Sequence, residues 1–206
     1  MFTITISIII ITCIISFTGF SNTRIIDDLI FWPPAITQRR QYYRFITCGF
    51  IHADMMHLFF NMFTLYWFGR AMEVYYPGRL GLPQYYFAIL YFGALVASLL
   101  PTYFKHRNDS QYRSLGASGA VCATLFAYIL LDPWQTIYVI FFPVPAILYA
   151  VMFLAYSIYM SRRGGDYINH DAHFYGALFG VVFTIVARPE VFTTFLNELS
   201  HPRFNF

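Results

Sequence analysis

The segment Leu115–Ala120, with the sequence LGASGA, stands between a polar loop that ends at Arg113 and an apolar run over residues 121–131. The glycines on both sides of Ser118 let the chain turn tightly and let another group approach the serine hydroxyl. The first N–H groups of the helix that follows have no partner within that helix and favour negative charge. This pattern is typical of a reactive serine at the start of a helix, and also of small residues that let two membrane helices touch.

The composition around this segment is that of an integral membrane protein. Hydrophobic residues make up 58% of the 206 residues and charged residues 11%, against roughly 45–50% and 25% in soluble domains. At about 20 residues per span, the chain has room for about six transmembrane helices and no separate soluble domain. The net charge of +3 is small and its basic residues are scattered, so we expect a lipid bilayer and no nucleic acid as partner.

We therefore expect one all-α domain over residues 1–206, built as a bundle of six transmembrane helices. The apolar runs predict spans at residues 3–20, 57–75, 84–103, 117–131, 144–160 and 172–187. The long aromatic segment 21–51 is expected to fold partly in the lipid headgroup region. The segment 134–142 precedes Pro143 and Pro145 and is expected at the membrane interface, outside the helices.

The fourth predicted span is unusually short. About fifteen residues at about 1.5 Å each cover roughly 22 Å, less than the roughly 30 Å hydrocarbon core. Asp132-Pro133 marks its far end at the membrane surface, so we expect the end that carries Ser118 to be submerged. Irregular backbone at that depth is tolerated only where protein encloses it or where it faces a water-filled cavity.

Connectivity brings four polar residues of the predicted spans to a similar depth. Spans two, four and six run in the same direction, and His57 with Asn61, Ser118 and His173 lie near their N-terminal ends. Intramembrane His and Asn side chains are costly without a partner, which favours a functional role. By contrast, His106, His170 and His201 fall in polar loops and are expected to be solvated.

His173 is the best candidate base for Ser118, because a serine hydroxyl needs a base and imidazole titrates near neutral pH. Gly176 and Gly180 follow it as a GxxxG face, which would pack on the small residues Gly119, Ala120 and Ala123 of span four. Candidate oxyanion donors are the N–H of Ser118, the amide of Asn61 and a ring N–H of His57. Asp171 is expected to cap span six, which leaves a dyad with no orienting carboxylate.

With these residues in place, the chain resembles the rhomboid family of intramembrane serine proteases in its bacterial six-helix form. The resemblance covers nearly the whole length and rests on three motifs, which are HADMMHLFFN at 52–61, GASG at 116–119, and AH at 172–173 followed by Gly176 and Gly180. Tyr43-Arg44 in the first loop and Glu73 with Gly78 after span two are similar to further family pairs.

The resemblance implies a division of roles. Ser118 would be the nucleophile and His173 the general base, while His57, Asn61 and the Ser118 N–H would hold the oxyanion. It implies no metal or other cofactor. The substrates would be single-span membrane proteins, cut in or near the bilayer at small residues where their helix can unwind.

One position departs from the family pattern. The family often has a Tyr four residues after the serine, stacked on the catalytic histidine, whereas this chain has Cys122. Another ring would have to hold His173, and Tyr175 and Phe126 are the candidates. His52, at the membrane edge, either takes part in the site or fixes the loop around it.

Two alternative functions use the same residues differently. A metalloprotease or metal transporter would use His52, His57, His170 and His173, but the sequence has no HExxH motif and no intramembrane carboxylate to complete such a site. A rhomboid-like protein without proteolysis would bind transmembrane helices, and would need neither Ser118 nor His173.

Location and orientation follow from the same features. A six-span form without a transit peptide is expected in a bacterial plasma membrane. Nine of the thirteen basic residues fall in loops one, three and five, and the positive-inside rule would place these loops in the cytoplasm. Bacterial rhomboid-like proteins have the reverse arrangement, and we follow the family here.

Overall fold

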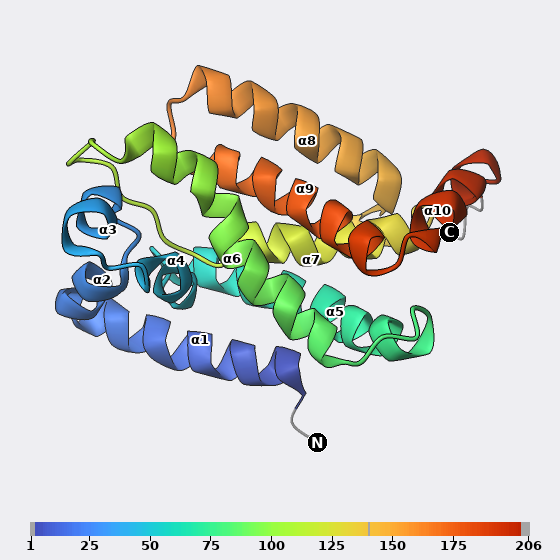
Figure 1. Cartoon of the computed structure of the whole chain (residues 1–206), viewed down its shortest axis with the longest axis horizontal. Helices are drawn as coiled ribbons and strands as arrows, with labels where there is room; N and C mark the ends of the chain where they lie inside the picture. The colour runs from blue at the N-terminus through green and yellow to red at the C-terminus, as the bar shows by residue number, and fades with distance from the viewer. Residues whose placement is uncertain (1–2, 140, 203–206) are drawn as a thin grey trace.

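The computed structural model describes residues 3–139 and 141–202 as a bundle of helices that run roughly along one axis (Figure 1). The longer helices are α1 (Ile4–Ser21), α5 (Met55–Gly78), α6 (Tyr85–His106), α7 (Ser118–Leu131), α8 (Ala146–Arg163) and α9 (His170–Ala187). Each coincides with one expected span to within a few residues. Among the described residues, α1, α6 and α9 are long and apolar enough to cross a membrane, and α7 is a shorter apolar helix. A helical membrane bundle is therefore confirmed, while the count of six spans stays a prediction.

The first loop folds into short helices around a buried arginine. These are α2 (Thr23–Leu29), α3 (Pro33–Arg39), α4 (Arg44–Thr47) and the 3-10 helix η1 (Cys48–Phe50). Arg44 is 5% exposed, and its Nη1 donates to the carbonyls of Asp27 at 2.9 Å and Ile30 at 2.7 Å, while its Nε donates to Gln41. The guanidinium satisfies backbone groups that would otherwise lack partners, so Arg44 is a structural residue of this loop.

Helix α7 lies inside the bundle, between α5, α6 and α9 (Figure 1). Every residue from Gly119 to Leu131 is buried. A helix that protein surrounds does not need the length of a lipid-facing span, because its ends can be enclosed by neighbouring elements. This burial is compatible with a submerged N-terminal end for α7, which stays a prediction.

The expectation of an all-α fold is wrong for the segment between α7 and α8. Strands β1 (Thr136–Val139) and β2 (Phe142–Pro145) form an antiparallel hairpin in which Thr136 pairs with Pro145 and Val139 with Phe142. Two prolines in β2 prevent a helix there, because proline lacks the N–H that a helix interior requires. Tyr138, Phe141 and Phe142 are between 72% and 86% exposed on this hairpin.

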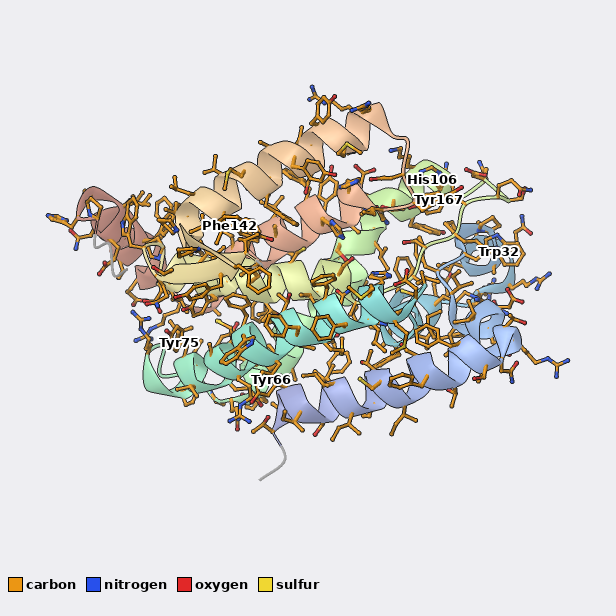
Figure 2. The ribbon with its side chains drawn as sticks, turned by 180° about the vertical axis from the view of Figure 1, so that it is seen from behind. Trp32, Tyr66, Tyr75, His106, Phe142 and Tyr167 are labelled. Carbon is orange, nitrogen blue, oxygen red and sulfur yellow. The ribbon has the colours of Figure 1, made fainter. Side chains whose placement is uncertain are left out.

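The two ends of the bundle carry different elements. Figure 2 shows Phe142 and Tyr75 toward one end, and Trp32, His106 and Tyr167 at the other. Helix α10 (Glu190–Ser200) lies with the hairpin segment, since the Trp134 indole donates to the Glu198 carbonyl at 2.7 Å. The first-loop helices and the α8–α9 loop form the opposite end, where the predicted site residues lie.

Candidate active site

Ser118 is the first residue of α7, and its hydroxyl meets the predicted base. The Oγ atom lies 2.8 Å from Nε2 of His173, in the first turn of α9. The turn before Ser118 passes through Gly116, whose φ of 110° is a left-handed conformation that other residues rarely adopt. The structure thus brings the predicted nucleophile and the predicted base into hydrogen-bond contact, an arrangement that could activate a serine.

Close packing of α7 on α9 produces this contact. A Cβ atom on Gly176 would collide with the backbone carbonyl of Gly119, and one on Gly180 with that of Ala123. The two helices therefore touch backbone to backbone, as the GxxxG pattern predicts. Because Ser118 and His173 lie within one turn of this contact, it fixes the distance between them.

His57 and Asn61 lie beside the dyad in the same cavity, which has a volume of about 560 Å³. The His57 ring packs on Gly116, where an added Cβ would lie 2.7 Å from Cε1 and 2.8 Å from Nε2 of that ring. One N–H of the Asn61 amide donates to the His57 carbonyl at 2.9 Å, and the amide has a second N–H to offer. The cavity is thus lined by the predicted nucleophile, the predicted base and two side chains that can donate to an oxyanion.

Of the two interpretations of His52, the structure favours the one in which it fixes the loop. Its Nε2 accepts the N–H of Ala117 at 3.4 Å, which leaves the proton on Nδ1, 3.0 Å from the hydroxyl of Ser16. That hydroxyl donates in turn to the Phe50 carbonyl at 2.9 Å. The ring also meets His57 edge to face at 4.9 Å. His52 therefore supports the backbone just before Ser118.

The ring that stacks on His173 is Phe153 of α8, with ring centres 5.9 Å apart and planes at 29°. Neither expected substitute does this directly. Phe126 packs on Phe153 at 5.7 Å, and Tyr175 is 37% exposed and contacts Phe174. The sequence offered no signal for Phe153, because its contact depends on how α8 crosses α9.

Two expectations about the start of α9 are wrong. Asn169, not Asp171, caps the helix by accepting the N–H of Ala172 at 3.0 Å. The Asp171 carboxylate instead binds Lys105 at 3.0 Å and the hydroxyl of Ser161. His170, expected to be solvated, is 4% exposed because it is the first residue of α9 and faces the bundle.

The histidines do not form a metal site in the described part of the chain. No group of three or more His, Cys, Asp or Glu side chains there has the arrangement to hold a metal ion. Three of the four imidazoles named in the metal hypothesis bind other partners, with His52 on Ala117, His170 on Asp166 and His173 on Ser118. That hypothesis therefore has no ligand set among these residues.

Comparison with known proteins gives three relatives of similar kind. RHOMBOID-like protein 12, mitochondrial, of Arabidopsis thaliana is 34% identical over 145 residues, which cover 64% of this chain and 42% of that protein. Rhomboid-like protein 11, chloroplastic, of Arabidopsis thaliana is 33% identical over 150 residues, covering 68% and 51%. Presenilin-associated rhomboid-like protein A, mitochondrial, of Danio rerio is 28% identical over 141 residues, covering 66% and 35%. The chain spans about half or less of the lengths of these relatives.

These relatives correct the expected location. All three are mitochondrial or chloroplastic proteins of eukaryotes, which contradicts the expectation of a bacterial plasma membrane. The family model of the rhomboid domain matches residues 39–190, well over half of the chain and all of the site residues described above. The chain therefore belongs to the rhomboid family.

Proposed function

We propose that this protein is an intramembrane serine endopeptidase in which Ser118 and His173 form the catalytic dyad. The observation that carries the proposal is the 2.8 Å contact between Ser118 Oγ and His173 Nε2. Both residues line the same cavity as His57 and Asn61. Membership of the rhomboid family supports it, since the matched region includes all four residues.

The proposed reaction is acyl transfer through a covalent intermediate. His173 takes the proton of the Ser118 hydroxyl at Nε2 while Oγ attacks the scissile carbonyl. The oxyanion is held by the Ser118 N–H, which has no partner within α7, and by the Asn61 amide and a His57 ring N–H. His173 then returns the proton to the leaving amine, and water hydrolyses the acyl-enzyme by the same route.

The substrate class follows from where the dyad lies. Ser118 opens an apolar helix that protein encloses, so a soluble peptide would have to leave water to reach it. We infer that the substrates are single-span membrane proteins whose helix unwinds near small residues. From the names of the relatives, we further propose that the reaction takes place in an organellar membrane.

The test is labelling of the full chain, in detergent and in lipid, with a serine-directed fluorophosphonate, together with cleavage of a single-span model substrate. Wild type should be labelled and should cleave the substrate. Ser118→Ala and His173→Ala should lose both reactions, since each removes one member of the dyad. Ser157→Ala is the matched control, because Ser157 is a fully buried serine on α8 whose hydroxyl has no hydrogen-bond partner among the described residues, and so none in the dyad.

The outcomes separate the two candidate activities. Labelling that is lost in both dyad variants and kept in Ser157→Ala supports the protease. A folded wild type that is neither labelled nor able to cleave the substrate, but that binds the substrate helix in lipid, would instead support a helix-binding protein without proteolysis.

A further inference from the structure

His170 is a buried histidine with one nitrogen that the fold leaves without a partner. Its side chain is 4% exposed, and among the described residues its Nδ1 atom has no hydrogen-bond partner. A buried polar atom without a partner is destabilising, and such atoms are uncommon in native proteins. The position of this atom, close to His173, therefore calls for an explanation.

Asp166 determines which nitrogen of His170 carries the proton. The Oδ2 atom of Asp166 lies 3.0 Å from His170 Nε2. This hydrogen bond lowers the pKa of the Asp166 carboxyl below its usual value, so the group is an ionised acceptor at neutral pH. Nε2 of His170 must then be the donor, and the neutral ring presents Nδ1 as a lone-pair acceptor.

His173 has the complementary arrangement of protons. Its Nε2 accepts from the Ser118 hydroxyl at 2.8 Å, which leaves the proton of the neutral ring on Nδ1 as a donor. The rings of His170 and His173 meet edge to face, with centres 5.8 Å apart and planes at 79°. A direct N–H···N bond between two imidazoles brings their centres to about 5 Å, so the rings would have to approach by somewhat less than an ångström and turn their Nδ1 atoms toward each other to form it. Catalytic hydrogen bonds are often long in the unbound enzyme and shorten during reaction.

We propose that His170, held by Asp166, is a positioning residue that accepts a hydrogen bond from Nδ1–H of His173 when His173 takes the proton of Ser118. The proposal rests on the proposed protease function and supplies the orienting partner that the dyad lacks. The proton of Ser118 moves to Nε2 of His173, the Nδ1 proton stays on His173, and no proton leaves His170. Tyr156 of α8 packs on His170 with ring centres 5.5 Å apart, and the cavity beside Ser118 is lined by the imidazoles of His57 and His173.

The test measures kcat and KM for the model substrate, and the rate of fluorophosphonate labelling, for variants of the full chain in lipid. His170→Phe removes the acceptor and should lower kcat about ten- to hundredfold, the range expected for a lost hydrogen bond to a charged group. KM should change by less than about twofold, because the bond forms only when His173 becomes charged. His170→Asn puts an amide oxygen near the place of Nδ1 and should recover at least part of kcat.

Asp166→Asn tests the role of the carboxylate without changing the buried ring. The amide N–H of the new Asn side chain can donate to Nε2 of His170. The proton of His170 would then lie on Nδ1, where it would meet the Nδ1–H of His173 donor to donor. This variant should also be slow. Asp109→Asn is the matched control, because Asp109 likewise pairs with a histidine, His106 at 3.2 Å, and accepts a backbone N–H two residues on.

Thermal unfolding of each variant shows whether it is folded. A folded His170→Phe with wild-type kcat, or a His170→Asn no faster than His170→Phe, would overturn the positioning role while leaving the dyad intact. If His170→Phe does not fold, slow Asp166→Asn beside normal Asp109→Asn supports the role, and equal rates overturn it. A wild type without labelling or cleavage would overturn the protease function and this inference with it.

Discussion

At the scale of single residues, three different elements hold the imidazole of His173. Ser118 of α7 contacts its Nε2, Phe153 of α8 stacks on its face, and the edge of His170 from α9 lies beside it. If His173 is the base, as proposed, an imidazole fixed on three sides loses little orientational freedom when the substrate arrives. The buried Cys122 on α7 leaves the stacking position to a residue from another helix.

The role of Phe153 can be tested by truncation. Phe153→Leu keeps apolar volume but loses ring stacking, which is worth about 0.5–1.5 kcal/mol, so we expect fluorophosphonate labelling about 3- to 10-fold slower. Tyr175→Leu is the control, because Tyr175 contacts Phe174 and is partly exposed. A Phe153→Leu variant that reacts at the wild-type rate would show that stacking does not hold the ring.

The support that His52 gives to the turn before Ser118 predicts a loss of stability. His52→Leu leaves the Ala117 N–H and the Ser16 hydroxyl without their buried partner, which should lower the free energy of unfolding by about 1–3 kcal/mol. His52→Gln offers an amide oxygen near the place of Nε2 and should recover part of it. The measurement is unfolding in detergent, and a His52→Leu variant as stable as wild type would contradict the role.

At the scale of elements, the contact between α7 and α9 could be predicted from the sequence, whereas the contact of α8 could not. Gly176 and Gly180 are four residues apart, so both glycines lie on one helix face and leave it without side chains that would hold another helix away. Phe153 belongs to a helix with aromatic residues on several sides, so its sequence does not single out the face that meets α9. The hairpin was missed for a similar reason, since Pro143 and Pro145 exclude a helix without specifying what replaces it.

A methyl group in the α7–α9 contact should displace the dyad. The Cβ of Gly176→Ala would meet the backbone of Gly119, the residue after Ser118. Because no side-chain rotation can relieve a clash with backbone atoms, α7 and α9 would have to move apart. We expect a loss of stability of about 1–3 kcal/mol and labelling about 10- to 100-fold slower, because small misplacements of reacting groups are costly. Gly93→Ala is the matched control, since its Cβ would meet only the end of the Phe179 side chain at 3.0 Å.

At the scale of the whole molecule, the sequence predicted the helical bundle and the grouping of His57, Asn61, Ser118 and His173 around one cavity, because hydrophobic runs and helix direction follow from local patterns. It did not predict the environment of single side chains such as His170, which depends on how loops fold back on the bundle. It also gave the wrong membrane, since the hydrocarbon core imposes the same demands on helices in bacteria and in organelles.

The arrangement of the ends predicts that Phe142 and Tyr167 lie on opposite sides of the bilayer. They flank α8, whose 18 residues at about 1.5 Å each cover roughly 27 Å, close to the hydrocarbon thickness. Helix α8 is not among the described helices that qualify as spans by hydropathy, so its crossing needs a direct test. Phe142 is 73% exposed and Tyr167 fully exposed, which makes both positions accessible to a reagent in water.

The test uses single Phe142→Cys and Tyr167→Cys variants in sealed proteoliposomes, treated with a membrane-impermeant maleimide before and after the vesicles are opened. Cys48 and Cys122 are buried, and the half-buried Cys13 is replaced by serine in every variant, with the Cys13→Ser parent as control. If α8 crosses the bilayer, the fraction of Phe142→Cys labelled from outside should equal the fraction of Tyr167→Cys that is protected, whatever the mixture of orientations. Equal labelled fractions at the two positions, in vesicles with one predominant orientation, would place both ends of α8 on one side and remove it from the spans.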